Sequence, residues 1–179
     1  MEKYNRIKAL ISLDAVKYNF EQMKKNIKEG TKIIAVIKAD AYGHGAVPIA
    51  RMLEEFDYIW GFAAATAQEA LQLRKAGITR PILILGLVFE EYYKKLAEND
   101  VRMAVCDYET ARKFNKAAEA AGKKGLIHLA ADTGMTRIGF KDSEESLEEI
   151  RRIAALPNVE IEGLFTHFAR ADEYDRTPA

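Results

Sequence analysis

Residues 32–45 read KIIAVIKADAYGHG, an apolar run that ends at Lys38 and is followed by a glycine-rich turn. Continuous apolar runs of this length are typical of parallel strands that are buried on both faces. In a parallel β/α barrel the active site lies at the carboxyl ends of the strands, where Lys38 stands. A partly desolvated lysine there would have a lowered pKa and could form an imine with an aldehyde. The same pattern fits a strand-end lysine that simply reaches water, so this stretch alone leaves both interpretations open.

Similar apolar runs recur along the chain, and longer amphipathic stretches separate them. Strand alternating with helix predicts an α/β fold with a parallel sheet. The predicted strands are Lys32–Lys38, Tyr58–Ala63, Pro81–Gly86, Val101–Cys106, Gly125–Ala131 and Glu160–Thr166.

The helical stretches show caps and apolar stripes. Thr66 and Glu69 have the spacing of a capping box, and Gly77 is placed to end the helix that they begin. Two other helices carry an apolar stripe at helical spacing. The stripes are Val16, Phe20, Met23 and Ile27 in the first, and Leu147, Ile150 and Ala154 in the second.

Two architectures fit this alternation: an open doubly wound sheet and a closed eight-stranded barrel. The glycine-rich phosphate-binding fingerprints of the open class, G-x-G-x-x-G and G-x-x-x-x-G-K-[ST], do not occur in the sequence. The predicted strands start roughly 26 residues apart, close to one eighth of a barrel of about 250 residues. We therefore predict a TIM (β/α)8-type barrel, here incomplete with about six βα units.

The composition excludes several classes of protein. The 179 residues include 27 basic and 27 acidic side chains, and this neutrality argues against a strongly basic nucleic-acid binder. No apolar run is long enough to span a bilayer, and the first residues lack the apolar stretch of a secretory signal. A single cysteine, Cys106, excludes an intrachain disulfide and a multi-cysteine metal site. We expect a cytoplasmic protein without a metal.

Two further segments place polar side chains just after predicted strands. Residues 132–140 read DTGMTRIGF, in which Arg137 could bind a carboxylate or a phenolate oxygen, or could instead pair with Asp132 or a helix end. His167 stands one residue beyond the last predicted strand. A lone histidine is more often structural than catalytic, but three polar residues at the ends of three strands together predict a site.

These segments resemble motifs of a known family. Val36–Gly45 looks like the pyridoxal-phosphate attachment motif of alanine racemases, and it is long and specific. Asp132–Gly139 and Thr166–Asp172 resemble two further motifs of that family, in the right order and spacing. Gly61–Gly77 and Pro81–Gly86 also fit, so the resemblance covers nearly the whole chain.

The resemblance implies a role for each matching residue. Lys38 matches the lysine that forms the aldimine with pyridoxal 5'-phosphate and serves as one of two catalytic bases. Tyr42 matches the tyrosine that hydrogen-bonds the cofactor phosphate, and His167 matches the histidine beside the pyridine ring. Arg137 matches an arginine near the cofactor's phenolic oxygen and the substrate carboxylate, and Met135 is assigned with it to substrate binding.

The implied activity is the interconversion of L-alanine and D-alanine, a cell-wall precursor. Serine or broad-specificity racemisation is an alternative, because the parts of the pocket that choose the substrate lie largely outside this chain. Another alternative is a non-catalytic partial barrel or engineered fragment that binds pyridoxal phosphate without turnover.

The sequence departs from the family pattern at two positions. Ala130 stands where many members have a lysine, commonly carbamylated, that orients the arginine matched by Arg137. Without that negative partner we expect Arg137 to be mobile or paired elsewhere. Arg170 stands where the family usually has a small residue, and a guanidinium there could alter the pocket.

The resemblance also implies a longer protein. Family members complete the barrel and add a C-terminal β-domain, and a tyrosine from that domain supplies the second base across a homodimer interface. We expect residues 1–179 to form only the cofactor-binding part of the barrel, with one base and negligible turnover alone. The unpaired first and last strands would then invite self-association.

Overall fold

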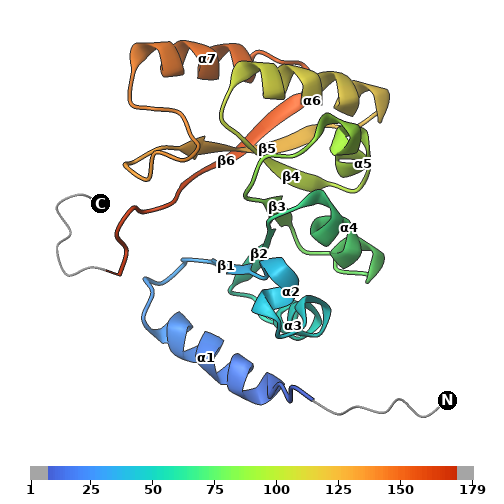
Figure 1. The fold of residues 1–179 in the computed structure, drawn as a ribbon, viewed down its shortest axis with the longest axis vertical. Helices are drawn as coiled ribbons and strands as arrows, with labels where there is room; N and C mark the ends of the chain where they lie inside the picture. Colours follow the sequence, from blue (N-terminus) through green and yellow to red (C-terminus); the bar gives the residue numbers. More distant parts are fainter. Residues whose placement is uncertain (1–7, 173–179) are drawn as a thin grey trace.

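A computed structural model describes residues 8–172 and contains one parallel sheet that curls into part of a barrel (Figure 1). The six strands lie side by side in chain order, so each one pairs with the next strand of the sequence. Every observed strand lies within two residues of its predicted bounds, and the predicted fold class is confirmed. The strands are β1 (Ile33–Val36), β2 (Ile59–Ala64), β3 (Ile82–Ile84), β4 (Val101–Val105), β5 (Gly125–Ala131) and β6 (Val159–Thr166).

The helices cover the convex side of the sheet, and the concave side is left open (Figure 1). This is the arrangement of a β/α barrel, in which each strand returns to the sheet through an outer helix. The helices are α1 (Leu13–Lys25), α2 (Lys38–Tyr42), α3 (Ala46–Leu53), α4 (Ala67–Lys75), η1 (Glu90–Tyr92), α5 (Tyr93–Glu98), α6 (Tyr108–Ala120) and α7 (Glu144–Ala154). None of the helices within residues 8–172 is long and apolar enough to cross a membrane.

Side-chain caps set where several helices begin. The predicted capping box at α4 is confirmed: Thr66 Oγ1 accepts from the backbone N–H of Glu69, and the Glu69 carboxylate accepts from the N–H of Thr66. At α6 the Asp107 side chain accepts from the N–H of Thr110, and at α7 the Ser143 side chain accepts from the N–H of Ser146. These oxygens satisfy N–H groups that a helix leaves without partners in its first turn.

The hydrophobic core lies between the convex face of the sheet and the helices. Central strands β3 and β4 are almost fully buried, as the apolar runs predicted, whereas the edge strands β1 and β6 alternate between buried and exposed positions. An edge strand has one neighbour, so part of its surface stays open to water.

The predicted apolar stripe of α7 is partly wrong. Ile150 packs against the core, but Leu147 is 46% exposed, and Ile153 rather than Ala154 is fully buried. The face of α7 that meets the neighbouring elements is therefore rotated toward Ile153. In α1, none of the residues is buried, and contact with the core is made by Val16 and Phe20.

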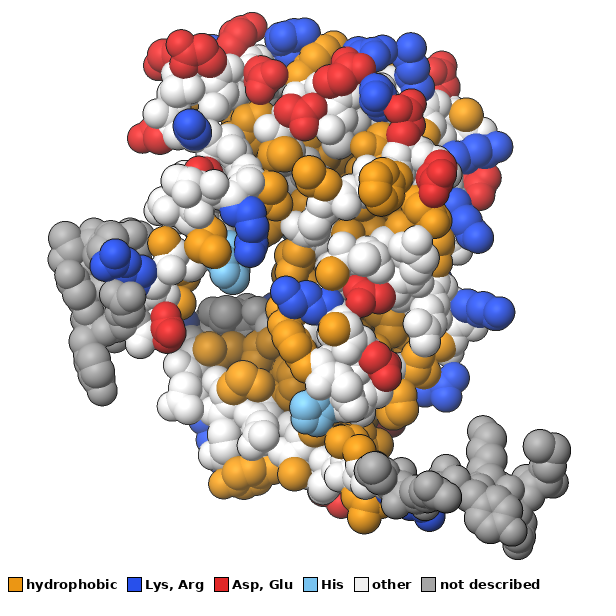
Figure 2. Space-filling model, viewed as in Figure 1, with side chains coloured by type: hydrophobic (Ala, Val, Ile, Leu, Met, Phe, Trp, Pro, Cys, Tyr) orange, Lys and Arg blue, Asp and Glu red, His pale blue; other side chains and the backbone are white. Residues whose placement is uncertain are grey.

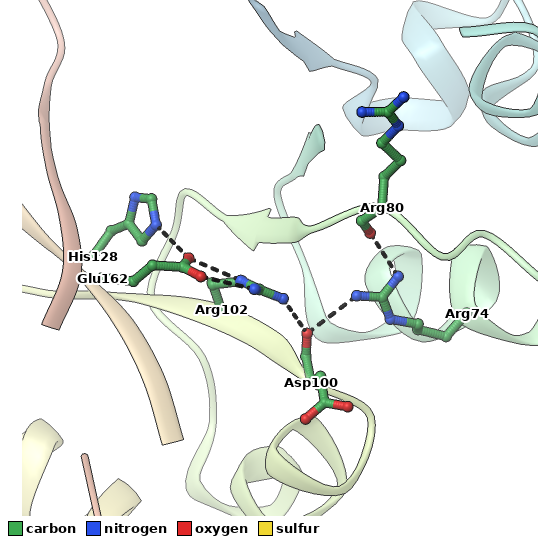
Figure 3. Close-up of polar contacts among 6 residues, drawn as sticks. All are labelled: Arg74, Arg80, Asp100, Arg102, His128 and Glu162. Carbon is green, nitrogen blue, oxygen red and sulfur yellow. Dashed lines mark hydrogen bonds and ion pairs between the residues drawn. The ribbon is translucent and has the colours of Figure 1, made fainter. Parts of the chain in front are cut away.

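Arginine side chains tie together the loops at the amino-terminal ends of the strands (Figure 3). Arg74 of α4 donates to the backbone carbonyls of Ile78, Arg80, Asn99 and Asp100 over distances of 2.7–3.1 Å. These bonds help to satisfy backbone carbonyls of the two loops, and the Asp100 carbonyl also accepts from Arg102 at 2.8 Å. This end of the sheet is thus fastened by structural contacts.

Candidate active site

A cavity of about 430 Å³ lies on the concave side of the sheet, and it is lined by residues from the strand ends and the loops that follow them. The face shown in Figure 2 is hollowed between the upper and lower parts of the molecule, with hydrophobic side chains on the wall. The volume is within the range of small-molecule sites. Apolar side chains from the strands line much of it: Ile34, Val36, Ala63, Leu83, Leu85, Ala130 and Phe165.

All five residues that the sequence singled out for the site line this one cavity: Lys38, Tyr42, Met135, Arg137 and His167. They come from the segments after β1, β5 and β6, so the curled sheet brings together residues up to 129 positions apart in the chain. The cavity therefore combines an apolar wall with an amine, a phenol, a guanidinium and an imidazole. What each group does there remains a prediction.

Lys38 and Tyr42 stand at the two ends of an unusual turn. Ala39, Asp40, Ala41 and Tyr42 all have positive φ, between 49° and 54°, so α2 is a left-handed turn. The sequence suggested only a glycine-shaped turn here, but the left-handed backbone begins before Gly43. The turn brings Lys38 Nζ to 5.9 Å from the centre of the Tyr42 ring.

The loop after β5 places Met135 and Arg137. Asp132 Oδ1 accepts from the backbone N–H groups of Gly134, at 3.1 Å, and Thr136, at 2.8 Å. These bonds hold the pKa of the Asp132 carboxyl below its ordinary value. Gly139 has a φ of 128°, and a Cβ there would meet the Asp132 nitrogen at 2.6 Å, so only glycine fits.

The loop leaves Arg137 exposed at the cavity, with no hydrogen-bond or ion-pair partner among residues 8–172. Asp132, which was one expected partner, instead uses its carboxylate on the loop backbone. Ala130 is 2% exposed and offers no charge to the guanidinium. Position 130 therefore supplies no partner for Arg137, and the alternative pairing with Asp132 is not observed.

His167 follows β6 directly and is exposed at the cavity. The end of β6 is tied to the loop after β5 because the hydroxyls of Thr133 and Thr166 lie 2.7 Å apart. Arg170, which could have altered the pocket, is not among the residues that line the cavity.

Sequence reasoning missed a polar cluster along the strands that precede the cavity residues (Figure 3). Arg102 of β4 donates to both carboxylate oxygens of Glu162 in β6, at 2.9 and 2.8 Å. His128 Nε2 lies 3.0 Å from the same carboxylate, and the ring of Trp60 contacts both His128 and Arg102. His128 lies in β5 and is 7% exposed. No local pattern signals the cluster, because its members come from four different strands.

Sequence reasoning also missed the second contact of Glu69. The capping box identified this residue, but its Oε1 also accepts from the N–H of Ala39, at 2.8 Å, in the turn that follows Lys38. Nothing in the spacing of Thr66 and Glu69 signals a partner 30 residues away.

Comparison with known proteins supplies an independent line of argument. Residues 11–179 match the family model described as the alanine racemase N-terminal domain. Alanine racemase from Methanococcus maripaludis is 43% identical over 169 residues, which cover 94% of this chain and 45% of the relative. This chain therefore spans about half the length of the curated relatives that it matches.

Solved structures agree with this result. Alanine racemase from Clostridium difficile 630 superposes with a TM-score of 0.91 at 43% identity, over 94% of this chain and 44% of that one. A histidine racemase from Leuconostoc mesenteroides superposes with a TM-score of 0.82 at 32% identity, over 92% of this chain and 44% of that one. The family match, the identities and the shared fold lead to one conclusion: the chain belongs to the family of alanine racemase N-terminal domains.

Proposed function

We propose that this chain is the cofactor-binding part of an alanine racemase, which interconverts L-alanine and D-alanine. One observation carries the proposal: the five residues chosen from the sequence, on three separate segments, line a single cavity at the carboxyl ends of the strands. Active sites of β/α barrels lie at this end.

Alanine racemases depend on pyridoxal 5'-phosphate, and the residues around the cavity fit that group. An amine that can react with an aldehyde stands beside donors that can hold anionic oxygens, and apolar side chains line the wall against a flat ring. When bound, pyridoxal phosphate supplies an electron sink that stabilises a carbanion on the substrate.

The residues that line the cavity then hold the cofactor, bind the substrate and move the proton. Lys38 Nζ is the amine that holds the cofactor, and it moves the proton at the substrate Cα on one side. The Arg137 guanidinium, with no internal partner among the described residues, is available to bind the substrate carboxylate. The Tyr42 hydroxyl would hold the phosphate of the cofactor, and His167 would lie beside its pyridine ring. Met135 shapes the space next to Arg137.

Racemisation requires a proton to be removed from one face of the Cα and returned on the other. We assign one base, Lys38, within this chain. The second base, in this proposal, belongs to a residue outside residues 1–179, so we expect negligible racemisation by this chain alone.

A second candidate function is racemisation of a different amino acid. The observation that favours it is the similar fold of the histidine racemase from Leuconostoc mesenteroides, a family neighbour whose name states another substrate. Ala130 also lines the cavity, and its methyl group occupies less of it than a lysine side chain would, which leaves more room for a substrate side chain. A non-catalytic cofactor-binding role is the third candidate.

We also propose that the protein is cytoplasmic and works as a homodimer. Within residues 8–172, β1 and β6 each pair with one neighbour, and the exposed fractions of Ile34, Val36 and Leu164 are 37%, 43% and 65%. Such unpaired strands favour self-association of residues 1–179, whereas the homodimer itself is what the family implies. Light scattering after size exclusion tests this: a dimer or larger species is expected, and a stable monomer at high concentration contradicts it.

Cofactor trapping tests the central proposal. The purified chain is mixed with pyridoxal phosphate, reduced with borohydride and digested, and the modified lysine is located by mass spectrometry. We expect the label on Lys38, and we expect Lys38→Ala to lose it, while Lys94→Ala on the exposed face of α5 keeps it. A label that persists in Lys38→Ala shows that the site is assigned wrongly.

Substrate choice needs a separate assay. L-alanine, L-serine and L-histidine are each incubated with the cofactor-loaded chain, and the D-isomers are measured by chiral chromatography. Negligible formation of any D-isomer is expected. Robust racemisation would contradict the missing second base, and the preferred substrate would then decide between the two racemase candidates.

A further inference from the structure

The backbone after Lys38 is held in a conformation that its residues disfavour. Ala39, Asp40, Ala41 and Tyr42 are four successive residues with side chains, and all have φ near 50°. For L-residues the left-handed region places Cβ close to the following carbonyl oxygen, so runs of this kind are rare. They persist when surrounding contacts over-determine them. The contacts that hold this turn therefore decide where Lys38 and Tyr42 point.

One such contact comes from outside the turn. Glu69 Oε1 accepts from the N–H of Ala39 at 2.8 Å, and this N–H belongs to the peptide that joins Ala39 to Lys38. Glu69 Oε2 accepts from the N–H groups of Ala65, at 2.7 Å, and Thr66, at 3.2 Å. One carboxylate thus joins the start of the turn to the segment between β2 and α4.

The exit of the turn is held separately. Asp40 Oδ1 accepts from the N–H of Ala46, the first residue of α3, at 2.8 Å, and the Asp40 carbonyl accepts from the N–H of Gly45 at 2.8 Å. Within the turn, the Ile37 carbonyl accepts from the N–H of Ala41 at 2.9 Å. The entrance of the turn depends on Glu69. The Ala39 N–H donates to the Glu69 carboxylate and not to a carbonyl of the turn itself.

We propose that Glu69 is a positioning residue for the active site: it fixes the entrance of the left-handed turn and thereby aims Lys38 and Tyr42 into the cavity. This inference rests on the proposed function, because it concerns the lysine that we assign to the cofactor. Glu69 touches neither cofactor nor substrate in this proposal, since it is not among the residues that line the cavity. Its effect reaches the site through the Ala39 peptide.

The chemistry of the contact requires a carboxylate. Both oxygens of Glu69 accept from N–H groups, on opposite sides. A glutamine has the same shape, but its NH₂ group would face an N–H donor on one side and leave a hydrogen bond unmade. Glu69→Gln is therefore a conservative variant that breaks one half of the link.

A matched control separates the link from the helix cap. Thr66→Ala removes the hydroxyl that accepts from the N–H of Glu69 in the capping box, but it leaves all three backbone donors of the Glu69 carboxylate in place. If Glu69 acts only as part of the cap of α4, the two variants behave alike. If it positions the turn, they differ at residues 38–43.

The first measurement needs no cofactor. Hydrogen–deuterium exchange is followed in peptides that cover residues 38–43 and the first turn of α4. Glu69→Gln is expected to speed exchange in residues 38–43 at least tenfold, whereas Thr66→Ala is expected to change exchange in α4 alone. Equal exchange in residues 38–43 for both variants and the unaltered chain would overturn the proposal.

The second measurement follows the cofactor. Pyridoxal phosphate is titrated by absorbance, and trapping on Lys38 is measured against pH. Glu69→Gln is expected to weaken binding about tenfold and to shift the pH profile of trapping, while Thr66→Ala stays within twofold of the unaltered chain. Faster exchange in Glu69→Gln with unchanged binding and an unchanged pH profile would also overturn the proposal.

The two measurements distinguish failure of the proposed function from failure of the positioning role of Glu69. If the unaltered chain binds no pyridoxal phosphate, the proposed function fails, and the exchange experiment still decides whether Glu69 holds the turn. If Glu69→Gln does not fold, Glu69→Asp replaces it: the charge is kept, but the shorter side chain cannot span both partners. The same loss at residues 38–43 is then expected, and its absence refutes the proposal.

Discussion

The polar cluster within the sheet makes a stability prediction that can be worked out from its geometry. Glu162 receives two hydrogen bonds from Arg102, and its Oε2 lies 3.0 Å from His128 Nε2. The side chains are 25%, 12% and 8% exposed, respectively. Glu162→Gln removes the charge but keeps the shape, and it leaves the Arg102 guanidinium without its counter-ion in a mostly enclosed place.

The loss of stability expected for Glu162→Gln lies between the values known for buried and for exposed ion pairs. Breaking a fully buried ion pair on one side costs about 3–5 kcal/mol, and an exposed pair contributes about 0–1 kcal/mol. The Arg102 side chain is mostly enclosed, but Glu162 keeps access to water, so the pair lies between the two limits and we expect a loss of about 2 kcal/mol in the free energy of unfolding. For a domain of this size that corresponds to roughly 4–8 °C in Tm.

The stability difference between the unaltered chain and Glu162→Gln depends on pH, and the direction of that dependence follows from the pKa of Glu162. Hydrogen bonding from Arg102 holds the pKa of Glu162 below its ordinary value, with help from His128 and against the opposing effect of burial. A lowered pKa means that this stabilisation is fully present above the unfolded value, about 4.3, and is lost as pH falls through the folded value. The difference in the free energy of unfolding between the unaltered chain and Glu162→Gln should therefore become smaller below about pH 4.

Urea unfolding followed by fluorescence tests the prediction, because Trp60 is the single tryptophan of the sequence and contacts the cluster directly. Glu160→Gln is the matched control: it makes the same change of charge on the same strand, at a residue that forms no ion pair within residues 8–172, and should stay within about 0.5 kcal/mol. The reasoning is refuted if both variants unfold at the same urea concentration at pH 7.

Three further predictions concern packing and caps, each measured by urea unfolding followed by circular dichroism. Gly61→Ala should destabilise the chain by about 3 kcal/mol, because its Cβ would lie 2.2 Å from the Pro81 carbonyl oxygen; an unchanged midpoint contradicts this close approach. Phe114→Ala should cost about 3–5 kcal/mol, since this ring is fully buried, and a loss under 1 kcal/mol would show that the site collapses. Asp107→Ala should cost about 1 kcal/mol through loss of the bond from the Thr110 N–H, while Asp107→Asn should cost much less; equal losses would rule out the cap.

The order and type of the elements follow from local pattern. The apolar runs that became strands carry their own signal, because central strands such as β3 and β4 have neighbours on both sides and are almost fully buried, although the edge strands β1 and β6 keep exposed positions. The cap of α4 could equally be predicted, since Thr66 and Glu69 are only three residues apart, at the N-cap and in the first turn of one helix. The stripe of α7 was misread in part, because burial of Ile153 depends on how the helix is rotated against elements that the helix itself does not specify.

The site residues were readable from the sequence because each one follows a strand, and parallel strands bring their carboxyl ends to one edge of the sheet. Lys38, Arg137 and His167 could thus be grouped before their distances were known. Their roles came from the resemblance to a family, and the structure adds that they share one cavity.

Tertiary structure alone decided how Lys38 is held and what lies deeper in the sheet. The left-handed turn depends on a carboxylate 30 residues away, at Glu69, and the cluster joins Arg102 to Glu162 across 60 residues. Such contacts are set by strand register and by the curl of the sheet, which no local run of residues encodes. The sequence by itself therefore determined which residues meet at the strand ends, and the packing of distant segments determined the backbone conformation in which they are presented.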